Sequence, residues 1–204
     1  GGLALIIALR RRKQQQNSLF VVRSSSEAET LAACWHDQLL LQSQPVIGLD
    51  VEWGAHFPAA LLQLSRSSSR GGTSTACFQL LKINPPPPSL LHLLADRAIL
   101  KTGVNVHEDL RRLEAWAATA SAKLSCAGGF DLVPLATSLG CSGRGLAALS
   151  LELLGERLRK GSVRTSDWEA ESLTREQIQY AANDARVSLL IYLALIERQQ
   201  RAGN

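Results

Sequence analysis

The stretch Pro45-Val46-Ile47-Gly48-Leu49-Asp50-Val51-Glu52 is an apolar run that ends in two carboxylates separated by one residue. Side chains alternate along a strand with a period of two, so Asp50 and Glu52 are expected to point to the same side. Acidic groups at the end of a buried strand repel one another and lose hydration, and such a cluster usually persists because divalent cations lie between the charges. The stretch therefore predicts a buried strand over residues 46–52 whose carboxylates bind metal ions for chemistry on a phosphate.

Further acidic side chains lie downstream at positions that fit the same site. Tyr180 and Asp184 are four residues apart in a predicted helix, so they share one of its faces. Asp109 falls where a predicted strand meets a predicted helix, at the carboxyl edge of the sheet where α/β proteins usually have their active sites. The candidate site thus has three motifs in chain order, Asp50-x-Glu52, Asn105-x-x-x-Asp109 and Tyr180-x-x-x-Asp184.

The remaining sequence predicts helices and strands around these motifs. The predicted strands cover residues 20–22, 46–52, 59–65, 75–80, 99–104 and 130–132. The predicted helices cover residues 26–41, 89–94, 109–118, 134–139, 146–154 and 174–199. Ser26-x-x-Glu29 and Thr174-x-x-Gln177 read as capping boxes that open the first and last helix, residues 65–74 as a hairpin loop and residues 84–88 as a stiff connector. A three-strand meander followed by alternating helix and strand predicts an α/β fold with a mixed sheet.

Length and charge limit the function classes. The 204 residues can form one domain with a real core, and 46% apolar residues exclude wholesale disorder. The net charge of +4 comes from Arg10–Lys13, since the rest of the chain has 22 − 4 = 18 basic and 18 acidic residues. A domain-wide basic patch is therefore not expected, and phosphate binding would depend on metal ions and local Lys or Arg.

Residues 1–18 are predicted to be a leader or tail, and residues 19–200 the functional domain. Gly1–Leu9 is shorter than the roughly 20 apolar residues that span a bilayer. It fits the trimmed end of an anchor or of a targeting segment, or an ordinary helix. No methionine occurs, even at position 1, so we expect a piece of a longer or trimmed protein. The four cysteines have no C-x-x-C pair or zinc-ligand spacing, which predicts reduced thiols inside the cell. The nucleus is the expected compartment, with a mitochondrion or other organelle as alternatives.

The three motifs resemble those of the DEDD superfamily of 3′→5′ exonucleases, in the subgroup with a tyrosine in the third motif. The connecting residues are similar to the Werner-syndrome exonuclease domain and its plant and animal relatives, and more distantly to ribonuclease D. The positions that carry this likeness are Gly155, Leu158, Lys160, Ser166, Trp168, Leu173-Thr174, Gln177, Tyr180–Ala185 and Ile191-Tyr192. Asp167 departs from the pattern, which usually has asparagine there, but it lies outside the catalytic set. The resemblance spans roughly residues 19–200 and implies a ribonuclease H-like fold with a mixed sheet of five or six strands flanked by helices.

The resemblance also implies a mechanism, which is phosphodiester hydrolysis at a 3′ end with two divalent cations, Mg²⁺ or Mn²⁺, and release of nucleoside monophosphates. Asp50 would bridge the two ions, Glu52 and Asp184 would complete one site, and Asp109 would support the second. Tyr180 would orient the attacking water rather than act as the base, because a phenol with a pKa near ~10 ionises little at neutral pH. DNA is the expected substrate, with RNA possible and a helicase or repair protein a conceivable partner. A module of the same fold without turnover and a ribonuclease D-like RNA exonuclease are the alternatives.

Other side chains near the motifs are candidates for substrate contacts, each weighed against an ordinary structural role. Lys160 and Arg164 are candidates for backbone phosphates, and Trp168 for base stacking, although a packing role is favoured for the tryptophan. The remaining candidates are Val51, Leu62, Asn105 and His107. The sequence does not indicate the oligomeric state.

Overall fold

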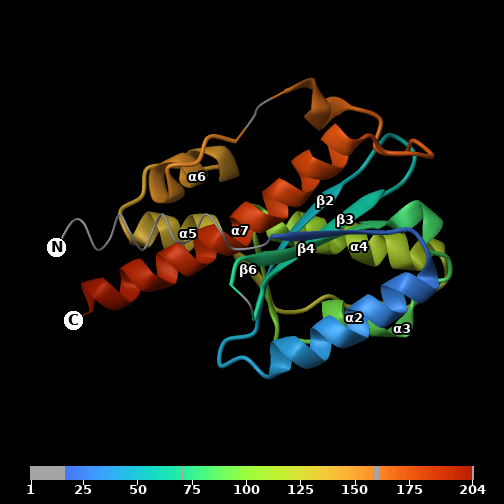
Figure 1. Cartoon of the computed structure of the whole chain (residues 1–204), viewed down its shortest axis with the longest axis horizontal. Coiled ribbons are helices and arrows are strands. Elements are labelled where there is room, and N and C mark those ends of the chain that lie inside the picture. Colours follow the sequence, from blue (N-terminus) through green and yellow to red (C-terminus); the bar gives the residue numbers. More distant parts are fainter. Residues whose placement is uncertain (1–16, 70, 159–160, 204) are drawn as a thin grey trace.

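The computed structural model describes residues 17–69, 71–158 and 161–203 (Figure 1). Six strands form one sheet in the order β1-β4-β3-β2-β5-β6. They are β1 (Ser18–Val22), β2 (Val46–Glu52), β3 (Leu61–Ser67), β4 (Thr73–Gln79), β5 (Leu100–Gly103) and β6 (Gly129–Asp131). The β2-β3-β4 meander is antiparallel, whereas β1 joins β4, and β5 joins β2 and β6, in parallel. The sheet is therefore mixed and six-stranded, as predicted.

Helices cover both faces of the sheet (Figure 1). They are α2 (Ser25–Leu40), α3 (Pro88–Ala95), α4 (Val106–Thr119), α5 (Leu132–Ser138), α6 (Leu146–Leu154) and α7 (Arg175–Ala202), with short 3₁₀ turns η2 (Leu80–Lys82) and η3 (Ser162–Thr165). One core cluster joins α2, α3 and α4 to the sheet, and two others involve α5, α6 and α7. Ile47, Leu49 and Val51 of β2 belong to the first cluster. The alternation of β2 thus turns Asp50 and Glu52 away from that core.

Most predicted elements are confirmed, with shifts at their ends. β2 and α6 have the predicted bounds, and the Thr174–Gln177 capping box opens α7. The hairpin loop is shorter than predicted because the β3–β4 ladder continues to the pair Ser67 and Thr73. α4 begins at Val106, three residues early, after Asn105 in the left-handed conformation (φ 59°).

The predicted capping box of Ser26 and Glu29 is wrong. The N-cap of α2 is Ser24, whose hydroxyl accepts a hydrogen bond from the N–H of Glu27 at 3.3 Å. Glu29 instead accepts hydrogen bonds from the backbone N–H and the hydroxyl of Ser89, at 2.9 and 2.7 Å. It therefore connects α2 to the first turn of α3, a contact 60 residues apart that local spacing cannot reveal.

The predicted leader, residues 1–18, lies outside the described residues except for Asn17 and Ser18. All four cysteines are free thiols. Within the described ranges, none of the helices combines the length and apolar character needed to cross a membrane.

Candidate active site

The site depends on a close contact between β2 and α7. Gly48 faces α7, and a Cβ atom at this position would lie 2.0 Å from the carbonyl oxygen of Ala185 and 2.7 Å from the backbone nitrogen of Leu189. Only a residue without a side chain lets the helix backbone approach this closely. Asp184 directly precedes Ala185, so this contact sets the carboxylate of α7 beside those of β2.

Three carboxylates converge at the end of β2. Asp50, Glu52 and Asp184 can each offer an oxygen such that these atoms all lie within 4.8 Å of one another. Glu52 is buried and the two aspartates are partly buried. Hard oxygen ligands at this spacing suit Mg²⁺ or Mn²⁺, so the donor set fits the cations that the sequence predicts.

The electrostatics show how costly the cluster is without a cation. Burial, and then the charges of the neighbouring carboxylates, raise the pKa of Asp50 well above the usual aspartate value. Burial and the charge of Asp184 raise the pKa of Glu52 to about 8, although Arg164 opposes this rise. Burial also raises the pKa of Asp184 to about 6. A bound divalent cation would reverse this trend by favouring the ionised oxygens.

Asp109 reaches the cluster from α4. β5 runs parallel to β2, so both strands end at the same edge of the sheet, and α4 follows β5 after a short turn. The backbone N–H of Asn105 in this turn donates to the carboxylate of Asp131 at 3.0 Å. Asp109 is buried, and burial raises its pKa to about 7. Its charge also raises the pKa of Asp50, which places it near the other carboxylates but outside the group of three.

Tyr180 lies one helical turn before Asp184 on α7, and its hydroxyl is close enough to lower the pKa of that carboxylate. Burial, and then the nearby carboxylates, raise the pKa of this phenol above its usual value, so the hydroxyl keeps its proton at neutral pH. Trp168 packs against the tyrosine with ring centroids 6.2 Å apart. The indole N–H donates to the carbonyl oxygen of Arg164 at 3.2 Å. Trp168 thus positions Tyr180 and the segment that carries Arg164.

The loop after β2 is held by two side chains, Glu169 and Arg112, whose contacts the sequence did not suggest. Glu169 accepts hydrogen bonds from the backbone N–H groups of His56 and Phe57, both at 2.9 Å. Arg112 of α4 lies over the ring of Trp53, 3.7 Å from its centroid. Its guanidinium also donates to the carbonyl oxygen of Pro58 at 3.3 Å. The contacts of Arg112 join the first and second motifs. All of these contacts link residues 54 to 113 positions apart, so local patterns could not predict them.

The structure places the side chains of three substrate-contact candidates in the core, the role that the sequence already favoured for Trp168. Val51, Leu62 and Trp168 have at most 3% of their surface exposed, and all three belong to core clusters. Their side chains therefore serve packing and are not available to a substrate. The alternation that groups Asp50 with Glu52 already turns Val51 to the opposite face.

The other candidates have different positions. Asn105, His107 and Arg164 are exposed, and Arg164 is close enough to Glu52 to affect its pKa. Lys160 lies outside the described residues. The predicted catalytic residues Asp50, Glu52, Asp109, Tyr180 and Asp184 are brought together.

A cavity of about 930 Å³ opens beside α7. Tyr180 and Asp184 contribute to its wall, together with Arg157, Val163, Arg175 and Gln179. Arg157 and Arg175 are exposed cations that the sequence analysis did not single out. No sequence motif marks these two arginines. Only their positions, one just after α6 and one in the first turn of α7, could have indicated them.

A mixed sheet that gathers buried carboxylates and a protonated tyrosine at its carboxyl edge defines a class of metal-dependent hydrolases acting on phosphates. Comparison with known proteins narrows this class. The model of a 3′-5′ exonuclease family matches residues 24–199, so the chain belongs to that family. The predicted resemblance is confirmed, and with it the ribonuclease H-like fold.

Several relatives show how far the likeness extends. Human "Exonuclease 3'-5' domain-containing protein 2" is 36% identical over 195 residues, which cover 86% of this chain and 29% of that protein. Mouse "Bifunctional 3'-5' exonuclease/ATP-dependent helicase WRN" is 31% identical over 173 residues, 76% of this chain and 11% of that protein. The chain spans 25 to 29% of the length of the first relatives it matches.

Solved structures agree with the observed fold. The EXD2 exonuclease domain soaked in Mn and Mg has a TM-score of 0.50 and 31% identity, covering 88% of this chain and 90% of that one. Escherichia coli RNase D has a TM-score of 0.71 and 24% identity, covering 91% of this chain and 46% of that one. At that identity, the likeness to RNase D supports the fold alone.

Proposed function

We propose that this domain is a 3′→5′ exonuclease that removes nucleoside monophosphates from the 3′ ends of DNA with the help of two divalent cations. The observation that carries the proposal is the convergence of Asp50, Glu52 and Asp184 within 4.8 Å, with Asp109 beside them. Such a cluster is unfavourable by itself and becomes favourable when cations lie between the oxygens. The relatives support the same activity, since they are exonucleases by name and the EXD2 domain has been soaked with Mn and Mg.

The residues of the chain have separate roles in this reaction. Asp50, Glu52, Asp109 and Asp184 would hold the cations, which when bound supply charge neutralisation at the leaving oxygen and a more acidic water. Tyr180 keeps its proton, so it orients a water beside the scissile phosphate by hydrogen bonding and does not act as a base. The buried ring of Trp168 packs against the ring of Tyr180 and helps to hold it in place.

The cavity beside α7 provides a path for the nucleic-acid strand. Tyr180 and Asp184 lie in its wall, so a nucleic-acid strand whose scissile phosphate lies at the carboxylate cluster can extend into this space. The exposed side chains of Arg157 and Arg175 can pair with backbone phosphates, and Arg164 lies near the cluster itself. Phosphate contacts of this kind make affinity depend on salt rather than on sequence.

Deletion of the carboxylates tests the activity. Asp50→Ala or Asp184→Ala should abolish Mn²⁺-dependent shortening of a 3′-end substrate labelled at its 5′ end, while circular dichroism shows a folded domain. Glu171→Ala, an exposed carboxylate outside the cluster, is the matched control and should keep the wild-type rate. Full activity in both cluster variants would refute the proposal.

The choice of DNA is tested by a substrate panel. Single-stranded DNA, recessed duplex DNA and RNA should each be digested with Mg²⁺ and with Mn²⁺, and faster digestion of RNA would move the assignment to the ribonuclease alternative. The EXD2 domain has been soaked with Mn and dGMP and with Mn and GMP, which makes both sugars worth testing. No metal-dependent cleavage of any polymer would favour a binding module without turnover. A nuclear site of action and a helicase or repair partner stay predictions.

A further inference from the structure

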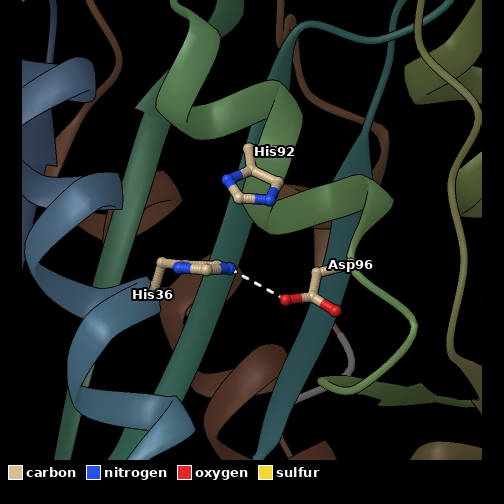
Figure 2. A group of neighbouring side chains, drawn as sticks. All are labelled: His36, His92 and Asp96. Atoms are coloured by element: carbon tan, nitrogen blue, oxygen red, sulfur yellow. Dashed lines mark hydrogen bonds and ion pairs between the residues drawn. The ribbon is translucent and has the colours of Figure 1, made fainter.

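A second group of potential metal ligands lies between α2 and α3, apart from the carboxylate cluster. His36 comes from α2, and His92 and Asp96 come from the last turn and C-cap of α3 (Figure 2). Each can offer one ligand atom such that these atoms all lie within 4.8 Å of one another. These two helices pack on the sheet face opposite α7, so the group belongs to a different layer from the exonuclease site.

The geometry of the group is partly set already. His36 Nε2 lies 2.9 Å from Asp96 Oδ2, and the side chains of both residues are mostly buried, with 12% and 19% of their surface exposed. The backbone N–H of Ala98 donates to the other oxygen of Asp96 at 2.9 Å, which fixes the carboxylate. Asp37 lies 3.8 Å from His36 Nδ1, which is too far for a hydrogen bond, whereas Nε2 is the nitrogen that faces Asp96.

His92 is the side chain that a simple helix contact does not explain. A His36–Asp96 hydrogen bond needs only two partners, yet the ring of His92 lies over that of His36 with centroids 4.5 Å apart and planes tilted by 31° (Figure 2). Two imidazoles this close repel when both are protonated. One divalent ion can use both as ligands.

We propose that His36, His92 and Asp96 form a binding site for a zinc-type transition metal that braces α2 against α3. Two imidazoles and one carboxylate are a common zinc donor set, whereas the all-oxygen active site suits Mg²⁺ or Mn²⁺. Ligands at roughly 2.0–2.2 Å from a tetrahedral zinc are separated by about 3.3–3.6 Å. Rotation of the exposed ring of His92 can bring its nitrogen closer to the ligand atoms of His36 and Asp96. The fourth coordination position is left to water or a small ligand.

A neighbouring cation does not block the site. Lys101 is buried close by, but its Nζ donates to the backbone carbonyl oxygen of Asp96 at 2.5 Å and not to the carboxylate. The backbone N–H of Asp96 likewise donates to the carbonyl of His92. Both carboxylate oxygens therefore stay on the side of the histidines and of Ala98.

The test uses the domain without a polyhistidine tag and with the active site disabled by Asp50→Asn and Asp184→Asn, so that metal at the exonuclease site cannot contribute. After removal of metal with a chelator, Co²⁺ serves as the spectroscopic probe and Zn²⁺ as its competitor. We expect one equivalent of Co²⁺ to produce the visible absorption of a nitrogen-coordinated ion, and Zn²⁺ to displace it and to raise Tm by several degrees.

His92→Ala decides the proposal, because this side chain is exposed and its loss keeps the His36–Asp96 hydrogen bond and the fold. It should weaken Zn²⁺ binding by more than about 100-fold. Arg97→Ala removes an exposed neighbour and no ligand, so it should bind like the parent. The proposal is overturned if His92→Ala binds Zn²⁺ as tightly as the parent, or if the parent binds only at millimolar concentrations. Neither result depends on whether the domain is an exonuclease.

Discussion

Gly48→Ala should damage both the stability and the activity of the domain through one displacement. The added Cβ would lie 2.0 Å from the carbonyl oxygen of Ala185, whereas ordinary contact begins at 3.4 Å, a shortfall of about 1.4 Å. The obstacle is helix backbone, so no side-chain rotation relieves it, and α7 and β2 have to move apart. Overpacking of this kind costs about 1–3 kcal/mol. For a domain of this size, that cost lowers Tm by roughly 2–12 °C.

The same movement reaches the chemistry, because Asp184 directly precedes Ala185 on α7. Mg²⁺ requires nearly ideal octahedral distances of roughly 2.0–2.1 Å, so a carboxylate displaced by about 1 Å no longer completes the site. Misplacement on this scale costs on the order of 100-fold in rate. We therefore expect Gly48→Ala to be folded at 20 °C but to shorten a labelled strand about 100-fold more slowly than the wild type.

Thermal unfolding followed by circular dichroism and a single-turnover digestion in Mn²⁺ measure the two effects. Gly145→Ala is the matched control, since a Cβ at this extended position (φ −146°) meets no heavy atom within 4 Å. As an N-cap exchange, it should cost about 1 kcal/mol or less and keep the rate. If Gly48→Ala melts and cleaves like the wild type, the backbone contact of β2 with α7 does not position the site.

Three further predictions concern the site and its surroundings. Tyr180→Phe should lower turnover by about 100-fold or more while Mn²⁺ affinity changes little, because the hydroxyl orients water and is not needed to hold the cations. An unchanged single-turnover rate would show that the hydroxyl does not have this role. In EDTA, Tm should fall as the pH rises from 5 to 8, because Glu52, with its pKa raised to about 8, and Asp184, with its pKa raised to about 6, bind protons more tightly in the folded than in the unfolded chain. Saturating Mn²⁺ should flatten this slope in the same melting experiment, and a rising Tm in EDTA would contradict the raised pKa values. Glu169→Ala should release the loop after β2, so chymotrypsin should cut after Trp53, which precedes Gly54, faster than in the wild type, and an identical digestion pattern would show that this carboxylate does not hold the loop.

The sequence predicts the site well where local geometry decides it. The period of two in β2 groups Asp50 with Glu52, and the helical period in α7 groups Tyr180 with Asp184. The order of elements then places the second motif, which follows β5, at the same sheet edge, because β5 runs parallel to β2. The resemblance to a known family adds the roles of these residues. The core of the site therefore follows from the sequence.

Long-range packing explains what the sequence does not predict. The pairing of β1 with β4 joins strands more than 50 residues apart, and no local pattern indicates it. Glu169 holds the backbone of His56 from 113 residues away. His92 and Asp96 have a visible helical spacing, but their partner His36 comes from another helix. In each case the tertiary fold, and not the local sequence spacing, brings the second partner into contact.

The carboxylate cluster destabilises the metal-free fold, which explains why the elements that carry it are held in close contact. At neutral pH, groups whose pKa is raised to about 6–8 destabilise the metal-free fold, and they would relax if their elements could slide apart. Two tight contacts oppose this. Gly48 lets β2 meet the backbone of α7, and Gly103 lies so close to β2 that a Cβ there would be 2.8 Å from the carbonyl oxygen of Leu49. Because the two glycines fix α7 and β5 against the same strand, the repulsion remains until cations relieve it. The metal-free domain is thus held ready to bind them, with most of the ligand geometry already formed.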